Sequence, residues 1–303
     1  MFRVAVFPDE ISQDFEHAAD VAKECGAEAL EIRTAWNKRT SAFGAEEVER
    51  ILSVTSARDL AIAGLSTQVF KCDIEDAEAC RDHLEVLKYC MAVAQALDCR
   101  VLRIWSFLRL PDPIPWPLVA ERFAPAIELA ESEDIVLGVE NEPTTNAATY
   151  DRLATFLSAV NHERVRAVWD PGNDVFAGEG KVPYPDGYAA LRPWLQSLHV
   201  KDVKRQPQPV RTAEGRVLMY DAVRFGSGEI DYAGLLRELY TDGFDGYLAL
   251  ETHRRASAAP SHGLTHYEQF SHGGEQPTRE CLASLHEMIR NLRSEGTAVS
   301  PRS

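Results

Sequence analysis

The sequence lacks three features that would place it in a membrane or in an oxidising compartment. None of its apolar runs approaches the roughly 18 residues that a membrane-spanning helix needs. Its opening segment, MFRVAVFPDEISQ, has no basic region followed by a long apolar core, so no signal peptide is expected. The six cysteines are scattered and include no CxxC pair, which argues against a disulfide framework. We therefore expect a reduced, cytoplasmic protein with no membrane partner.

The sequence also lacks an excess of positive charge. It contains 32 Lys and Arg against 47 Asp and Glu, which gives a net charge of −15. Binding to a nucleic-acid backbone requires a clustered basic face, so no nucleic-acid partner is expected. Small anionic ligands need only a few local cations and stay open. The hydrophobic content of 45% is ordinary for a globular protein, and 303 residues can bury a large core without disulfides.

Short β-branched or aliphatic runs alternate with longer segments of helical periodicity along the whole chain. Helices between successive strands imply parallel pairing, because each crossover returns the chain to the same end of the sheet. An open, doubly wound sheet would place a glycine-rich phosphate loop after the first strand, where Pro8, Asp9 and Glu10 stand instead. The pattern predicts an α/β fold, a single closed (β/α)8 TIM barrel. Its eight strands are expected at Arg3–Phe7, Ala29–Arg33, Ala61–Ser66, Val101–Ser106, Val136–Glu140, Ala167–Asp170, Ser197–Lys201 and Tyr247–Glu251.

The alternation predicts one barrel domain over residues 1–293, followed by a C-terminal tail at 294–303. Two insertions interrupt the rhythm, at about 202–228 and 254–276. The second is rich in histidine, with His262, His266 and His272. Because both insertions follow strands, they belong to the face of the barrel where active sites form. Long surface loops without a function are the alternative.

Four consecutive predicted strands end in residues that can bind a metal ion: Glu140, Asp170, His199 and Glu251. A single one of these would say little, because a lone strand-end aspartate or histidine usually has a structural role. Glutamate directly after an aliphatic run is rarer, since its charge is costly to bury unless it is paired or metal-bound. Three carboxylates and one imidazole suit Mn2+, Mg2+, Co2+ or Zn2+. The pattern therefore predicts one divalent metal ion in the mouth of the barrel.

The chain resembles the sugar phosphate isomerase/epimerase superfamily of xylose isomerase-like barrels over nearly its whole length. Within that superfamily it is closer to a branch with a DEIS start and an RIFSF-like fourth strand, for which the resemblance fixes no single reaction. The endonuclease branch fits poorly, because its extra histidines are missing where strand two ends in Arg33 and strand three in Ser66. The segments that carry the resemblance are PDEISQDFEHA, ALEIRTAW, STQVFKCDIED, RVLRIWSF, VENE, WDPGN, HVKD, GSGEIDY and LALETH.

The resemblance implies the metal ligands Glu140, Asp170, His199 and Glu251, with Mn2+ as the first choice of ion. It also implies that Glu140 and Glu251 act as an acid/base pair on a sugar whose enediolate the metal stabilises. The chain departs from the epimerases at Asn173, where they usually have a histidine, and at Asn146, where they have a second glutamate. Epimerase specificity therefore does not carry over.

Further residues are assigned to the site by their match to the same branch or by their place near a strand end. Lys201 could neutralise developing negative charge or simply pair with Asp170, and His253 could act as an acid/base or only bind a loop. Arg205 could hold a substrate oxygen or be solvated, and Trp105 could line the site or belong to the core. The catalytic candidates are Glu140, Glu251, Lys201 and His253, and the substrate-binding candidates are Glu10, Arg33, Lys71, Arg103, Trp105, Asn173 and Arg205.

The first functional expectation is a divalent-metal-dependent sugar or sugar phosphate isomerase or epimerase. The alternative is a metal-dependent lyase or dehydratase acting on a keto-sugar, a cyclitol or a C-glycoside, since the histidine-rich insertion could supply an acid for a leaving group. A non-catalytic sugar-binding barrel is a distant third. The expected partner is a small carbohydrate substrate, and analogy with the family implies a homo-oligomer, either a dimer or a tetramer.

Overall fold

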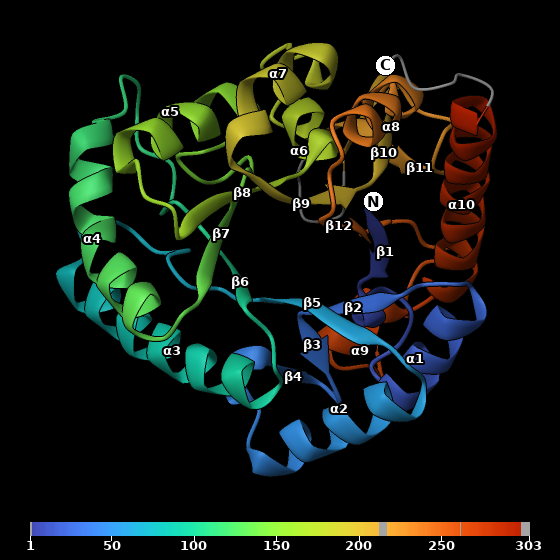
Figure 1. Ribbon diagram of the computed structural model, residues 1–303, viewed down its shortest axis with the longest axis horizontal. Helices are drawn as coiled ribbons and strands as arrows, with labels where there is room; N and C mark the ends of the chain where they lie inside the picture. The colour runs from blue at the N-terminus through green and yellow to red at the C-terminus, as the bar shows by residue number, and fades with distance from the viewer. Residues whose placement is uncertain (1, 212–216, 261, 298–303) are drawn as a thin grey trace.

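The computed structural model describes residues 2–211, 217–260 and 262–297, and its centre is a closed barrel of parallel strands. Figure 1 shows the helices forming an outer ring around these strands. The strand order around the barrel is β1-β12-β9-β8-β7-β6-β5-β2, so neighbours in sequence are neighbours in space. The barrel strands are β1 (Arg3–Val6), β2 (Ala29–Ile32), β5 (Ala61–Ser66), β6 (Val101–Ile104), β7 (Val136–Glu140), β8 (Val165–Trp169), β9 (Leu195–Val200) and β12 (Tyr247–Leu250).

Every expected strand is present within two residues of its expected ends, and the predicted (β/α)8 barrel is confirmed. Helical segments lie between successive barrel strands, as a parallel sheet requires. Shorter 3-10 turns include η1 (Pro8–Glu10), directly after β1, and η2 (Thr40–Ala42). The larger helices are α1 (Phe15–Glu24), α2 (Ala45–Ala57), α3 (Ala77–Ala96), α4 (Trp116–Ser132), α5 (Tyr150–Val160), α6 (Pro171–Phe176), α7 (Tyr188–Leu191), α8 (Tyr232–Thr241), α9 (His266–Ser271) and α10 (Glu275–Thr297).

Alternation along the strands decides which side chains point into the barrel. In β12, Leu248 and Leu250 join the large apolar core between strands and helices. Ala249 belongs instead to a small cluster inside the barrel, together with Phe7. Two residues after Ala249, Glu251 therefore points to the interior at the carboxyl end of the strand. The barrel interior thus has an apolar floor with the ionisable groups above it.

Both predicted insertions contain regular structure. The first forms an antiparallel hairpin of β10 (Asp202–Arg211) and β11 (Val217–Val223). Asp202 closes the turn after the hairpin by accepting hydrogen bonds from the backbone of Gly226 and Gly228. A Cβ at Gly228 would lie 2.1 Å from the Asp202 carboxylate, so only glycine fits there.

The second insertion carries α9, which lies against η1 at the start of the chain (Figure 1). The short hairpin of β3 (Thr34–Ala35) and β4 (Lys38–Arg39) also packs beside η1. Gly274, which follows α9, allows the second insertion to lie close to η1, because a Cβ at this position would meet the backbone oxygen of Glu10. Helix α10 continues to Thr297, so the expected tail begins inside this helix, while residues 298–303 lie outside the described part.

No helix in the described ranges is long and apolar enough to cross a membrane. All six cysteines are free thiols. Burial raises the pKa of Cys90 and of Cys99 to about 12, so both are protonated at neutral pH and act as small apolar side chains.

Candidate metal centre and active site

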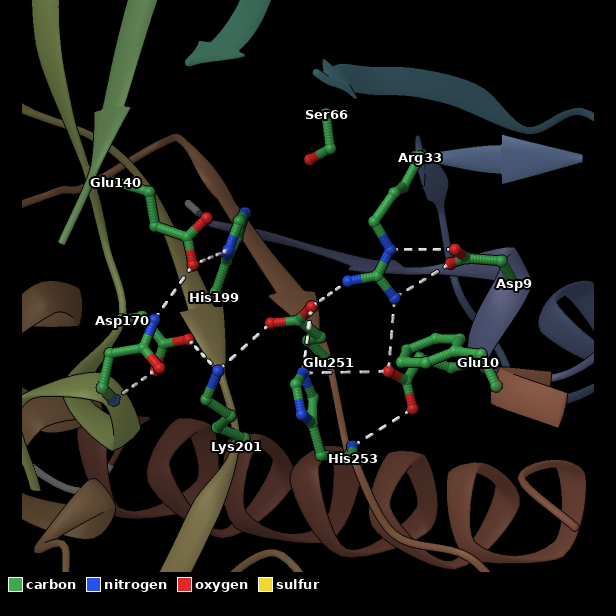
Figure 2. Close-up of polar contacts among 12 residues, drawn as sticks. Asp9, Glu10, Arg33, Ser66, Glu140, Asp170, His199, Lys201, Glu251 and His253 are labelled. Carbon is green, nitrogen blue, oxygen red and sulfur yellow. Dashed lines mark hydrogen bonds and ion pairs between the residues drawn. The ribbon is translucent and has the colours of Figure 1, made fainter. Parts of the chain in front are cut away.

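Four side chains at the carboxyl ends of β7, β8, β9 and β12 converge in the mouth of the barrel. One potential ligand atom from each of Glu140, Asp170, His199 and Glu251 lies within 4.8 Å of the others, and all four residues are buried. Figure 2 shows Glu140, Asp170 and His199 on one side of Glu251. The structure therefore brings together all four residues that the sequence nominates as ligands.

The strand register explains this convergence. His199 pairs with Ala249 in the neighbouring strand, which sets Glu251 level with Lys201 two residues later. Glu140 pairs with Val168, and Asp170 follows that strand directly and caps α6 through a hydrogen bond from the backbone of Asn173. Side chains from four adjacent strands then reach one point, because strand ends in a barrel share one rim.

Two buried atoms in this cluster lie against charged neighbours: His199 Nδ1 is 3.1 Å from Glu140 Oε1, and Asp170 Oδ2 is 2.6 Å from Lys201 Nζ. His199 Nε2 lies 2.9 Å from Glu31 Oε1, which favours a hydrogen on this nitrogen. Nδ1 would offer its lone pair once a metal ion displaces its proton. With carboxylate oxygens beside it, Nδ1 completes an N/O donor set of the kind that divalent metals bind. The residues present fit a divalent ion.

A chain of hydrogen bonds holds His199 in this orientation. Ser66 donates to Glu31 Oε1 at 2.6 Å, and Arg103 Nε donates to the Ser66 hydroxyl at 3.2 Å. Phe7 packs edge-on against the imidazole, with ring centroids 5.0 Å apart. Burial disfavours the charged imidazole, but the charges of Glu31 and Glu140 hold the pKa of His199 well above its ordinary value. A carboxylate on the far nitrogen is the usual support of a metal-binding histidine.

Lys201 lies inside the cluster as an ion-pair partner. Its Nζ is 2.6 Å from Asp170 Oδ2 and 3.2 Å from Glu251 Oε2. Burial would lower the pKa of Lys201, but the two carboxylates raise it above its ordinary value, so the side chain is charged. Burial raises the pKa of Asp170 above its usual range despite this ammonium. Lys201 therefore balances part of the negative charge that the carboxylates bring together.

Arg33 forms the second centre of charge in the mouth. Its Nε is 2.8 Å from Asp9 Oδ2 and its Nη2 is 3.4 Å from Glu10 Oε1, while Nη1 contacts Glu251. Burial opposes charge on Arg33, but these three carboxylates raise its pKa well above the ordinary value. Figure 2 shows Glu251 between Arg33 and the other three candidate ligands, Glu140, Asp170 and His199. The Glu251 carboxylate therefore joins the charges around Arg33 to the candidate metal site.

His253 lies at the open edge of the site. Its Nε2 is 3.1 Å from Glu251 Oε1, and its side chain is 39% exposed. Its backbone N donates to Glu10 Oε2 at 3.1 Å, and its φ of 53° is unusual for a residue other than glycine. Burial would raise the pKa of Glu251, but Lys201, His253 and Arg33 hold it well below the ordinary value. Because its side chain is partly exposed, His253 is accessible to a ligand in the mouth of the barrel.

The candidates from β6 and from the segments that follow β5, β6 and β8 lie on the opposite wall. Arg103 Nε is 3.1 Å from Glu140 Oε2, and the guanidinium stacks on Trp105 at 4.0 Å. Lys71 Nζ lies 4.6 Å from the same ring. Asn173 Nδ2 donates to Glu140 Oε1 at 3.2 Å. Burial would raise the pKa of Glu140, but His199 and Arg103 lower it below its ordinary value.

Arg205 is the candidate that the structure leaves apart. It lies in β10, its side chain is exposed, and its backbone N donates a hydrogen bond to Glu229 Oε1 at 2.8 Å. Among the described residues, no ion pair joins its guanidinium to the cluster. Asn146, where the resembling epimerases have a glutamate, binds the backbone of Ser106 and Leu110 and so has a structural role here.

Three residues of the site were not among the candidates predicted from the sequence. Asp9 pairs with Arg33, Arg255 Nη1 pairs with Glu10 Oε2 at 2.8 Å, and Glu31 supports His199. Glu31 carried a usable signal, since a glutamate inside the aliphatic strand ALEI must find a partner. Arg255 carried none, because its position depends on the fold of a long insertion.

Comparison with known proteins agrees with the barrel. A family model described as xylose isomerase-like TIM barrel matches residues 19–286. No curated protein matches the chain significantly.

Solved structures with the same fold differ in the activities that their names state. An L-ribulose 3-epimerase is 14% identical, with a TM-score of 0.73, and the alignment covers 100% of this chain and 99% of that one. A probable 3-DHS dehydratase, AsbF, from Bacillus anthracis is 18% identical, with a TM-score of 0.71 and 94% and 99% covered. A xylose isomerase-like protein from Mycobacterium smegmatis in complex with magnesium is 16% identical, with a TM-score of 0.66 and 94% and 97% covered. At these identities the likeness shows the fold alone.

Proposed function

Because the chain belongs to the xylose isomerase-like TIM barrel family, we propose that it is a divalent-metal-dependent isomerase or epimerase of a sugar or sugar phosphate. The observation that carries the proposal is the buried donor set of Glu140, Asp170, His199 and Glu251, whose potential ligand atoms lie within 4.8 Å of one another. Mn2+ is the first choice of ion, with Mg2+, Co2+ and Zn2+ as alternatives. A cytoplasmic location and a homo-oligomeric state belong to the same proposal.

The side chains around the cluster suit removal of a proton beside a carbonyl group. A bound divalent ion would polarise the carbonyl and stabilise the adjacent negative charge. Glu140 and Glu251 come from different strands, and both have a pKa below the ordinary value, so both are in the ionised form that a proton acceptor requires. Lys201 brings a fixed positive charge beside Glu251. Return of the proton to the same carbon gives an epimer, and return to the neighbouring carbon gives an isomer.

A lyase or dehydratase is the second candidate, and the position of His253 favours it. Its imidazole is partly exposed and lies 3.1 Å from Glu251 Oε1, where it can protonate a departing oxygen. The probable dehydratase from Bacillus anthracis shows that the fold is also associated with a proposed elimination. Both candidates share the first proton removal and differ in what happens next.

The first test combines metal analysis with product analysis. The purified enzyme is expected to retain about one equivalent of divalent metal per chain after dialysis, because four buried ligands hold it. The Mn2+-loaded enzyme would then be incubated in D2O with ketoses, aldoses, inosose-type cyclitols, keto-sugars and glycosides, and products followed by NMR and mass spectrometry. Deuterium beside the carbonyl with an unchanged formula supports the isomerase or epimerase.

Loss of water or of an aglycone would move the assignment to the lyase. Absence of both metal and exchange across the panel would contradict the metal-dependent reaction in either form. Chelation followed by return of Mn2+ provides the internal control, since only a metal-dependent activity recovers.

Glu31→Gln is expected to weaken metal binding about 10–100-fold, the usual cost of losing the partner of a metal-binding histidine. The amide keeps the shape but removes the charge that favours a proton on His199 Nε2. Isothermal titration calorimetry of the metal-free protein with Mn2+ measures the change in metal affinity.

Ser66→Ala is the matched comparison. It removes the bond that orients Glu31 but leaves the Glu31–His199 pair in place, so a smaller loss is expected. Equal Mn2+ affinity in the wild type and Glu31→Gln would show that Glu31 does not position His199 for the metal.

A further inference from the structure

A cavity of about 170 Å³ lies beside the four candidate metal ligands, under the second insertion. Its lining includes Arg33 and Ser66, and both also contact residues of the cluster or its support: Arg33 pairs with Glu251, and Ser66 binds Glu31. Figure 2 shows both side chains at the edge of the cluster. A substrate held at the metal can therefore extend directly into this cavity.

The part of the cavity nearest the cluster is already satisfied by bonds within the protein. Asp9 accepts from Arg33 and from the Thr34 hydroxyl at 2.9 Å, which neutralises its charge. Thr40 donates to the backbone oxygen of Ser66 at 3.2 Å. These groups form a fixed wall with little capacity left for a ligand.

The outer lining is different, because it includes the exposed polar residues Arg39, Ser41 and His266. No hydrogen bond or ion pair within the described ranges uses the side chain of Arg39, Ser41, Gln68 or His266. The printed contact of the Arg39 guanidinium is with the ring of Tyr267, at 6.0 Å from the centroid. All four side chains can donate hydrogen bonds, and one carries a full positive charge.

Arg39 is exposed, and its guanidinium has no carboxylate partner among the described residues, unlike those of two arginines nearby. Arg50 and Arg58, on the neighbouring α2 segment, both have one. Arg39 lines a cavity without one, in a position to meet an anion from outside the chain.

We propose that this cavity binds an anionic group, a carboxylate or a phosphate, at the end of the substrate remote from the metal. The proposal rests on the proposed function and narrows its substrate to sugar acids or sugar phosphates. Arg39 would bind the anion through its planar fork of donors, with Ser41, Gln68 or His266 donating from the sides. The cavity has the volume of about six liquid water molecules, which admits such a group.

The test measures anion binding to protein from which metal ions have been removed with a chelator, so that the metal site does not contribute. Inorganic phosphate and glycerate are titrated separately by isothermal calorimetry into the wild type and into Arg39→Gln. At least one of the two is expected to bind the wild type, and Arg39→Gln is expected to bind it about 10–100-fold more weakly, as for the loss of a charged hydrogen bond. The anion that binds more tightly identifies the source of the charge.

Arg81→Gln is the matched control, since Arg81 is an exposed arginine of α3 that lines the outer face near α4. Its loss removes the same charge and should leave the affinity unchanged. Ser41→Ala provides a second variant, with an expected loss of a few fold from one neutral hydrogen bond.

Equal affinity of wild type and Arg39→Gln for both anions, or no binding of either by the wild type, would overturn the proposal. These outcomes leave metal content and deuterium exchange unaffected, so they are distinguishable from failure of the proposed function. A loss of affinity in Arg81→Gln as large as in Arg39→Gln would also overturn it, because it would show a general charge effect.

Discussion

Replacing Glu140 by glutamine is expected to lower kcat/KM about 10²–10⁴-fold even at saturating Mn2+, with the substrate that the panel identifies. The amide cannot accept a proton, and it also removes one negative ligand from a site of three carboxylates and one imidazole. The two effects separate in one experiment: titration with Mn2+ restores the bound metal, while the rate at saturation reports the acid/base role. Glu251→Gln should behave in the same way.

Glu85→Gln is the control, because Glu85 is exposed on α3 and Lys88 is its ion-pair partner among the described residues. It changes the net charge equally and should not alter either quantity. Full recovery of the rate of Glu140→Gln by added Mn2+ would reduce Glu140 to a ligand and leave Glu251 and His253 as the groups that move protons.

Arg33→Met is expected to lower the free energy of unfolding by about 3–5 kcal/mol, the usual cost of leaving a buried charge without its partner. Among the described residues, Arg33 is the only cation within ion-pair distance of Asp9, whose side chain is buried. Burial already raises the pKa of Asp9 although Arg33 and Thr34 oppose it. Urea denaturation of the metal-free wild type and variant measures the change in the free energy of unfolding without a contribution from bound metal.

The double variant Asp9→Asn with Arg33→Met completes a thermodynamic cycle. Removing both charges should recover a large part of the stability, because the loss comes from the unpaired carboxylate rather than from packing. An equal loss in the single and double variants would contradict this cause and point to lost stacking of Arg33 on Phe270, at 4.6 Å.

Much of the site could be predicted from the sequence because strands have a simple period. A strand alternates its side chains between two faces, and a barrel places all its carboxyl ends on one rim. An acidic residue or histidine at the end of an aliphatic run is therefore assigned to the mouth without knowledge of any contact. Glu140, Asp170, His199 and Glu251 met this condition on adjacent strands, and they lie together.

The supporting residues did not follow from period alone. Glu31 lies inside β2, and its partner His199 is 168 residues away in the chain. The bond could be identified only once the closed barrel placed β2 opposite β9. Arg205 shows the reverse case, since a match by position gave no information on how the hairpin of β10 and β11 leaves the rim.

The sequence by itself determined the order of strands and helices, the rim on which the ionisable groups lie and the identity of the four residues that could hold a metal ion. Only the tertiary structure decided which charges compensate one another: Lys201 with Asp170, Arg33 with Asp9, and Arg255 with Glu10. It also decided that Arg39 lines a cavity and has no ion-pair partner among the described residues. The physical reason is range: periodicity acts over a few residues along the chain, whereas ion pairs act over a few ångströms through space and join segments that folding alone brings together.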